Sequence, residues 1–351
     1  MLITKLCSAL LVTGLALTTS GCSSPSTPTG PAGESSTKAT EGGTIRIGLI
    51  GLMSDAGVAI ALERGYFEKR GVVLEVQDFP SGGGMVAPMA AGDLDIGGGA
   101  FSAGMVNAVG TGNPIVIVAD KGSFPTPELG SQQFVVRTDV ADQIREFSDL
   151  EGRKVAVGTA VGTAPYAGVI MALQDGGISD PESLITSMKS SDVVVALANG
   201  AVEAAWLSEP NAALAIQKGY ALPWKTAYDV APMEQDSTIF YNTVWAEANP
   251  GLAQSFMDAY VCGVNDYLAA VKDPTKKNEV LQILADYTTI PVDVLKEARP
   301  PGYFANAVPD VDSIEHIVQS FDDLGQTTET VPMDQLVDLQ YVNAAIGADC
   351  G

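Results

Sequence analysis

The sequence has little histidine, few basic residues and no closely paired cysteines. Its single histidine, His316, excludes any metal site or mechanism that needs two. There are 19 Lys and Arg against 42 Asp and Glu, and no basic stripe, which excludes nucleic-acid binding through phosphate neutralisation. The four cysteines, Cys7, Cys22, Cys262 and Cys350, have no CxxC spacing, which excludes zinc ribbons and thioredoxin motifs.

What the chain does contain is enough apolar sequence to build a large core. Of its 351 residues, 46% are apolar and only 17% are charged, which excludes disorder for most of its length. At roughly 150 residues per domain, this length predicts two domains or one large one.

The N-terminal segment resembles a bacterial lipoprotein signal. An apolar run from Leu6 to Leu17 is too short for a membrane span and is followed by Thr-Thr-Ser-Gly-Cys, which resembles a lipobox ending at Cys22. We therefore predict a signal peptide over 1–21, lipidation of Cys22, and a flexible Ser/Thr/Pro/Gly tether over 22–43. This places the protein outside the cytoplasm, anchored by lipid to the bacterial cell membrane. An ordinary secretory signal with an accidental cysteine is the alternative.

From residue 44 onward, strand patterns and helix patterns alternate, which predicts α/β lobes with largely parallel sheets. After about residue 237 the pattern becomes mostly helical. The expected strands are 44–50, 72–76, 94–96, 115–118, 134–136, 154–157 and 202–207. The expected helices are 58–64, 85–91, 100–109, 165–173, 193–198, 210–218, 251–271, 277–287 and 314–324.

Three segments together resemble the nitrate/sulfonate/taurine solute-binding family of ABC importers, which also includes binders of thiamine precursors. They are Ala61–Val72 with its Gly-Tyr-Phe, Ala90–Gly97, and Leu197–Pro210 with its Ala-Ala-Trp-Leu-Ser-Glu-Pro. Within them, the sequence context favours core packing for Tyr66 and Phe67, and cap or turn roles for Asp93 and Asp95.

The resemblance implies a type II periplasmic-binding-protein fold, with two α/β lobes, a hinge and a central ligand cleft. Lobe one would comprise 44–131 and 237–351, and lobe two 132–236. The implied function is capture of a small solute by lobe closure, without a cofactor or metal, and delivery to a membrane permease and its ATPase. A monomer is expected.

Ligands of open α/β sheets lie beyond the carboxyl ends of the strands, and this rule selects the candidate binding residues. Those in lobe one are Met53, Ser54, Ser81, Gly82, Gly83, Gly99, Ala100 and Phe101, with Asp55 and Lys121 in the same loops. Those in lobe two are Thr159, Val161, Gly162, Thr163, Trp206 and Glu209, and Tyr241 lies near the return crossing.

The candidate loops contain one cation, Lys121, and two anions, Asp55 and Glu209. Glu209 favours an amine or ring N–H on the ligand, while helix N-termini suit an acidic end. Three aromatic side chains, those of Phe101, Trp206 and Tyr241, would stack on a flat ring. An amino-sulfonate such as taurine, or a nitrogen heterocycle such as a thiamine-pyrimidine precursor, therefore fits better than nitrate. A capping role for Glu209 ahead of Pro210 stays open.

An enzyme is the competing class. Ala100-Phe101-Ser102-Ala103-Gly104 comes close to a nucleophile elbow, with His316 as the only available base for a serine hydrolase. Fungal thiamine-pyrimidine synthases share the implied fold, but this chain lacks their cysteine-rich motif.

Cys7 would be removed with the signal peptide and Cys22 would carry the lipid. The other two cysteines, Cys262 and Cys350, are expected to form a disulfide in an oxidising compartment, with two free thiols as the alternative.

Overall fold

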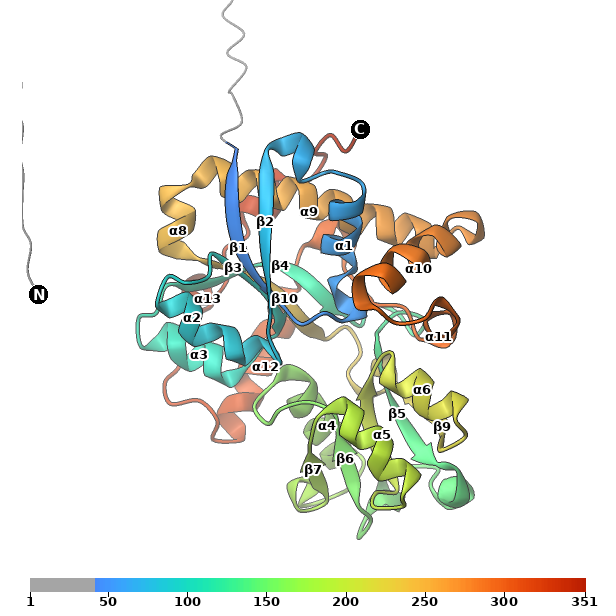
Figure 1. Cartoon of the computed structure of the whole chain (residues 1–351). Helices are drawn as coiled ribbons and strands as arrows, with labels where there is room; N and C mark the ends of the chain where they lie inside the picture. Colours follow the sequence, from blue (N-terminus) through green and yellow to red (C-terminus); the bar gives the residue numbers. More distant parts are fainter. Residues whose placement is uncertain (1–41) are drawn as a thin grey trace, which may run out of the picture. The chain divides into compact units, whose positions relative to one another are not determined.

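The computed structural model describes residues 42–351, so the expected signal peptide, the lipidation site at Cys22 and nearly all of the tether lie outside the described residues. Two five-stranded sheets form the framework (Figure 1). The first has the order β2-β1-β3-β10-β4 and the second has the order β7-β6-β8-β5-β9. We call each sheet, with the helices packed on it, a lobe. The first lobe contains the sheet β2-β1-β3-β10-β4, and the second lobe contains the sheet β7-β6-β8-β5-β9.

Each sheet mixes parallel and antiparallel pairs, so the prediction of largely parallel sheets is wrong. In the first, β1 is parallel to β2 and β3, and β10 is antiparallel to β3 and β4. In the second, β6 is parallel to β7 and β8, and β5 is antiparallel to β8 and β9. The strands are β1 (Gly43–Leu49), β2 (Val72–Asp78), β3 (Ile96–Ala100), β4 (Ile115–Ser123), β5 (Gln132–Arg137), β6 (Val155–Val157), β7 (Ile185–Ser187), β8 (Ala204–Ser208), β9 (Ala221–Thr226) and β10 (Gln235–Asn242).

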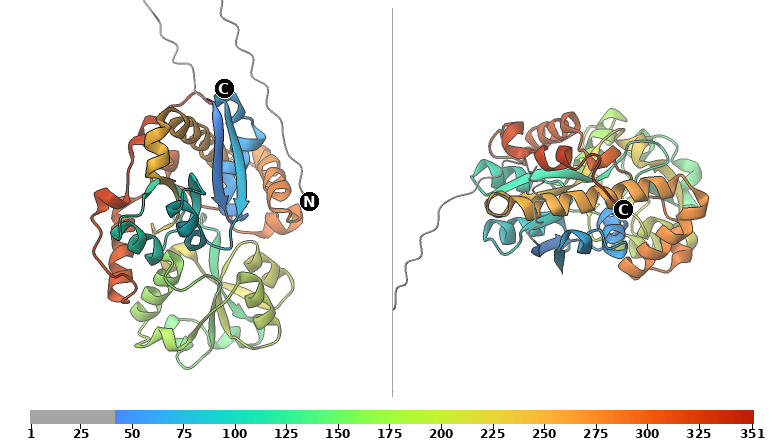
Figure 2. Two further views of the ribbon diagram at one scale, coloured as in Figure 1. Left: turned by 60° about the vertical axis from the view of Figure 1, so that its left-hand side comes forward. Right: turned by 90° about the horizontal axis from the view of Figure 1, so that it is seen from above.

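Helices cover both faces of the sheets. Helix α9 packs on α1 over the first sheet, as the view from above shows (Figure 2), and α12 packs on both α3 and α4. The helices are α1 (Ala56–Glu63), α2 (Val86–Ala90), α3 (Ala103–Gly110), α4 (Ala164–Asp175), α5 (Ser190–Ala198), α6 (Asn211–Gln217), α7 (Ala227–Val230), α8 (Thr243–Ala248), α9 (Pro250–Val271), α10 (Pro274–Thr288), α11 (Val292–Glu297), α12 (Val311–Asp323), α13 (Met333–Leu336) and α14 (Gln340–Ala344).

Neighbouring residues of the central strands alternate between separate apolar cores. On β10, Ile239 and Tyr241 pack into one core and Phe240 into another; on β5, Phe134 and Val135 divide in the same way. Side chains of a strand point alternately to opposite faces, so each sheet is buried on both sides. The predicted two-lobe α/β fold is confirmed, whereas the exact lobe boundaries stay predictions.

Several expected elements differ from those in the structure. The chain returns to the first sheet through β10, where the sequence predicts mostly helix, and β7 and β9 are not expected. Strand β3 is Ile96–Ala100 rather than 94–96, so Gly97, Gly98 and Gly99 are strand residues, not a loop that opens a helix. Helix α3 consequently begins at Ala103.

Close packing explains the glycines of β3. A Cβ on Gly97 would lie 2.2 Å from Cε2 of Phe240, and one on Gly99 would lie 2.7 Å from Cα of Gly82. A side chain at either position would displace its neighbours, because protein interiors are close-packed.

We expect Gly97→Ala to lower the free energy of unfolding by about 1–3 kcal/mol, since the added methyl overpacks the contact with Phe240. Urea denaturation measures the change. Gly104→Ala is the matched control, because Gly104 is exposed and a Cβ there meets nothing closer than 3.8 Å. Equal stability of the two variants would contradict this account of β3.

The predicted core roles of Tyr66 and Phe67 are confirmed, since both side chains belong to the core beside α9. Asp95 is more than a turn residue: its buried carboxylate pairs with Arg46 and accepts the backbone N–H of that residue at 2.8 Å.

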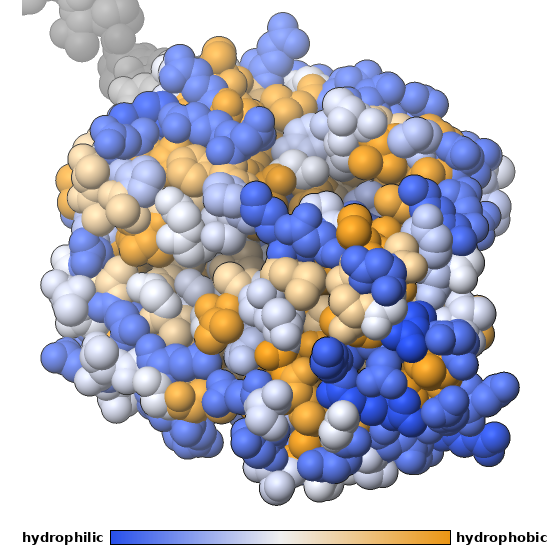
Figure 3. Space-filling model, turned by 60° about the horizontal axis from the view of Figure 1, so that its bottom comes forward, coloured by the Kyte–Doolittle hydropathy of each residue, from blue (hydrophilic) through white to orange (hydrophobic). Residues whose placement is uncertain are grey.

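Between residues 42 and 351, no helix is both long and apolar enough to cross a membrane. On the surface in Figure 3, hydrophobic residues lie among hydrophilic ones.

Candidate functional site

A cavity of about 610 Å³ lies between the two lobes. Its lining comes from the carboxyl ends of strands in both sheets, as the rule for open α/β sheets predicts. The lining residues lie at or directly after the ends of five strands: Ile50, Leu52 and Ser54 after β1, Pro80, Ser81 and Gly82 after β2, Gly158, Thr159, Ala160, Thr163 and Pro165 after β6, Ser187, Met188, Lys189, Ser190 and Ser191 at the end of β7, and Ser208, Glu209 and Asn211 at the end of β8. Two chain crossings between the lobes add Ser131, Gln132, Asp236 and Ser237. We call this space the cleft.

Seven of the predicted binding residues line the cleft: Ser54, Ser81, Gly82, Ala100, Thr159, Thr163 and Glu209. Local structure holds several of them. Ser81 accepts the N–H of Gly84 at the start of a short 3₁₀ turn, and the hydroxyls of Thr159 and Thr163 lie 3.1 Å apart.

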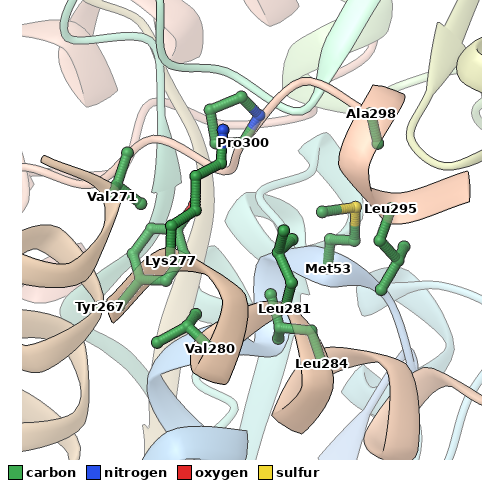
Figure 4. A pocket seen from close by; sticks show the side chains of 10 residues that line it. All are labelled: Met53, Tyr267, Val271, Lys277, Val280, Leu281, Leu284, Leu295, Ala298 and Pro300. Carbon is green, nitrogen blue, oxygen red and sulfur yellow. The ribbon is translucent and has the colours of Figure 1, made fainter. Parts of the chain in front are cut away.

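Three predicted residues near these positions do not line the cleft. Met53 instead lines an apolar cavity of only about 20 Å³ between α10 and α11 (Figure 4). A space of that size holds about one water molecule, so it is a packing gap rather than a ligand site. Gly99 packs against Gly82, and Gly83 is exposed beside it.

The aromatic stacking prediction is wrong, because Phe101, Trp206 and Tyr241 are buried in the cores. Phe101 packs on Phe321, and Trp206 on Phe134 at 5.3 Å between ring centroids. The hydroxyl of Tyr241 donates to the carbonyl of Ala253. Each of the three side chains points into an apolar core and not into the cleft.

Val161 and Gly162 do not line the cleft, although Thr159 and Thr163 of the same loop do, and the loop also contacts the other lobe. The N–H of Ala103 donates to the carbonyl of Gly162, and the N–H of Ala164 donates to that of Phe101, both at 2.9 Å. Val161 is 58% exposed at the tip of this loop. These bonds join the segment before α3 to the segment before α4.

Lys121, the cation expected to face the ligand, is fully buried in an ion pair. Its Nζ lies 2.6 Å from Oδ1 of Asp55 and donates to Oγ of Ser54 at 3.1 Å. The other oxygen of Asp55 accepts N–H groups from Gly51 and Leu52. The pair therefore neutralises itself beneath the cleft and offers little free charge to a ligand.

Glu209 lines the cleft, but its carboxylate has partners in both lobes. Oε1 accepts from Nε2 of Gln133 at 2.7 Å and from the N–H of Arg299 at 3.2 Å, and Oε2 accepts the N–H of Ala213 in the first turn of α6. Burial raises the pKa of this carboxyl. The geometry thus supports the capping role, together with a link between the lobes.

Asp236 is the carboxylate that sequence reasoning missed. It lies at the start of β10, is 5% exposed and lines the cleft. It accepts from Nε2 of Gln132 at 2.7 Å and from the hydroxyl of Ser237 at 2.8 Å, while Nε1 of Trp206 donates to Oε1 of Gln132. Trp206 therefore does not contact the cleft itself but holds the amide of Gln132 in the orientation in which it donates to Asp236. Burial raises the pKa of Asp236 to about 6, against the opposing effect of the Lys121 charge.

The N-terminus of α5 is the second feature that was missed. Lys189, Ser190 and Ser191 line the cleft there. The first N–H groups of a helix have no acceptor within it and carry the positive end of the helix dipole, so they suit an anion. This loop directly follows β7, so a prediction of strand β7 from the sequence would have selected it by the strand-end rule. No pattern in the sequence indicates Asp236.

The hydrolase alternative has no structural support. Oγ of Ser102 accepts the N–H of Met105 and caps α3, and His316 lines a different cavity on α12. In the described part of the chain, no hydrogen bond joins the two side chains.

The family model described as NMT1/THI5 like matches residues 54–276, which is more than half of the chain. The chain belongs to this family. The resemblance found in the sequence is thereby confirmed. A comparison with curated protein sequences gave no match.

Solved structures show the same fold at low identity. The periplasmic nitrate-binding protein NrtA from Synechocystis PCC 6803 is 18% identical with a TM-score of 0.69, covering 89% of this chain and 90% of that one. The periplasmic aliphatic sulphonate binding protein SsuA from Escherichia coli is 20% identical with a TM-score of 0.66, covering 84% and 92%. The desulfurization enzyme DSZB is 17% identical with a TM-score of 0.61, covering 87% and 99%. Since both binding proteins and an enzyme have this fold, function must be argued from the site.

Proposed function

We propose that this protein is an extracytoplasmic, lipid-anchored solute-binding component of an ABC importer. It captures a small polar organic ligand in the cleft and delivers it to a permease and its ATPase. The cleft, lined from both lobes at the carboxyl ends of their strands, carries the proposal. A ligand that contacts both lobes stabilises the closed form through its higher affinity for that form.

The charges around the cleft favour a ligand with separated positive and negative ends. Asp236 supplies a buried carboxylate for an ammonium or ring N–H. Lys189 and the first N–H groups of α5 supply donors for an acidic group. An amino-sulfonate such as taurine matches both ends, and a nitrogen heterocycle matches the first. The burial of Lys121 disfavours a small inorganic anion as the sole ligand, because the cation is already paired.

A thermal-shift and calorimetric screen tests the proposal. The probes are taurine, ethanesulfonate, which lacks the amine, a thiamine-pyrimidine precursor, and nitrate. We expect a shift with taurine or the pyrimidine and a weaker one with ethanesulfonate, and X-ray scattering should show compaction on binding. A strong shift with nitrate alone would overturn the proposed ligand class. Binding without compaction would overturn the closure mechanism.

Ligand affinity should depend on pH through Asp236. Since its pKa is raised to about 6, the carboxylate that holds a ligand cation is ionised above that pH and protonated below it. Affinity should therefore be level near pH 8 and fall about tenfold per pH unit below 6. Calorimetry with the best ligand measures this.

The variant Asp236→Asn should bind about 10- to 100-fold more weakly at pH 8, because a hydrogen bond to a charged group is lost. Its affinity should no longer fall with acid. The matched control is Asp142→Asn, an exposed aspartate of the second lobe outside the cleft. An unchanged pH profile in Asp236→Asn would rule out this role.

A further inference from the structure

A second cavity, of about 520 Å³, lies between α4, the segment 230–234 and the start of α12. We call it the α4–α12 cavity. Its size is in the range of small-molecule sites. Its wall carries the carboxyl groups of Asp175, Glu234, Asp310 and Asp312 and the imidazole of His316 at separate places, and it includes no lysine or arginine.

Glu234 is the unusual member of this lining. It is only 6% exposed, and its Oε1 has no hydrogen-bond partner within residues 42–351. A buried, unpartnered carboxyl group is costly, so a site that retains one calls for a physical explanation. The nearby charge of Asp236 adds to the cost, and burial raises the pKa of Glu234 well above its usual value.

Helix α4 makes room for this carboxyl group. A Cβ on Gly168 would lie 2.8 Å from Oε2 and 3.0 Å from Oε1 of Glu234. Glycine inside a helix costs about 1 kcal/mol relative to alanine, so Gly168 lowers the local stability of α4. The missing side chain leaves a recess in the wall of the cavity, and the carboxyl group of Glu234 lies in it.

We propose that the α4–α12 cavity is a second binding site, for a small organic cation whose ammonium or guanidinium group pairs with Glu234. The acidic lining supplies the charge complement, and the side chains of Met171, Val230 and Ile317 supply apolar contacts for a short carbon chain. A bare metal ion fits less well, since no group of three or more metal-ligating side chains comes together in the described residues.

The site has a direct connection to the cleft. Glu234 lines one cavity and Asp236, two residues later, lines the other. The lining also joins α4 of the second lobe to α12, and the hydroxyl of Ser313 on α12 accepts the N–H of Gln235 at 2.8 Å. A cation bound here therefore contacts the segment that connects the lobes.

Calorimetry on the purified protein at pH 8 tests the proposal. The probes are methylammonium, putrescine and guanidinium, with Mg²⁺ and Ca²⁺ as inorganic competitors. We expect at least one organic cation to bind with a Kd below about 1 mM, and Glu234→Gln to weaken it about tenfold or more. Asp312→Asn, an exposed change that leaves the fold intact, should weaken it less.

Two variants separate this site from other sources of binding. Glu315→Gln removes an exposed charge of α12 that does not line the cavity, and should leave affinity unchanged. Asp236→Asn should weaken ligand binding in the cleft about 10- to 100-fold but retain organic-cation binding here. Three results would overturn the proposal: no organic cation binds, only metal ions bind, or cation binding depends on Asp236 but not on Glu234. None of them would contradict the proposed function.

Discussion

Replacing Lys121 by methionine is expected to lower the free energy of unfolding by about 3–5 kcal/mol, among the largest effects of any single change in this protein. The side chains of Lys121 and Asp55 are both 0% exposed, and their charged atoms lie 2.6 Å apart. Without the lysine, the carboxylate of Asp55 stays buried with an uncompensated charge. Methionine fills similar volume, so the loss reports on charge rather than on a cavity.

Chemical denaturation measures this loss, and Lys218→Met on the exposed end of α6 is the matched control. Lys121 also lowers the pKa of Asp236, so the variant should shift the acid limb of ligand binding to higher pH. A loss of less than about 1 kcal/mol would mean that the Lys121–Asp55 ion pair contributes no more to stability than an ion pair on the surface does.

The second large effect is expected from the disulfide. The structure joins Cys262 of α9 to Cys350, which is the pairing that the sequence predicts. The two residues are 88 positions apart, and closing a loop of that length stabilises the fold by on the order of 4 kcal/mol in the chain-entropy model. Cys350→Ser should lose about that much, measured by urea denaturation.

Reduction provides the control for this prediction. A reducing agent should destabilise the original protein by a similar amount and leave Cys350→Ser unchanged. The neighbouring contact from Arg70 to the carbonyl of Asp349 should loosen in both cases. Mass spectrometry that finds two alkylatable thiols at Cys262 and Cys350 in the folded, unreduced protein would refute the bond.

The sequence by itself determined the fold class and most of the framework. Local signals were sufficient for β1, β2, α4 and α9, because apolar periodicity and terminating glycines act within a few residues. The same signals, with the strand-end rule, selected seven residues that line the cleft, including Ser81 and Glu209, and their contact with a ligand stays a prediction.

Only the tertiary structure decided what the polar and aromatic side chains do. Lys121 and Asp55 were expected to face a ligand, yet they pair with each other, because each finds its partner 66 residues away in sequence. Phe101 directly follows β3, and Trp206 and Tyr241 lie within β8 and β10. Nothing local tells whether such a ring faces the cleft or an apolar core.

The same limit explains why Asp236 and Glu234 were missed. Their importance comes from burial and from the chain crossing that places β10 between β3 and β4, and neither is encoded in the neighbouring residues. Periodicity determines which residues form a strand, whereas the strand's neighbours in the sheet and the helices packed on it determine which charges lose contact with water.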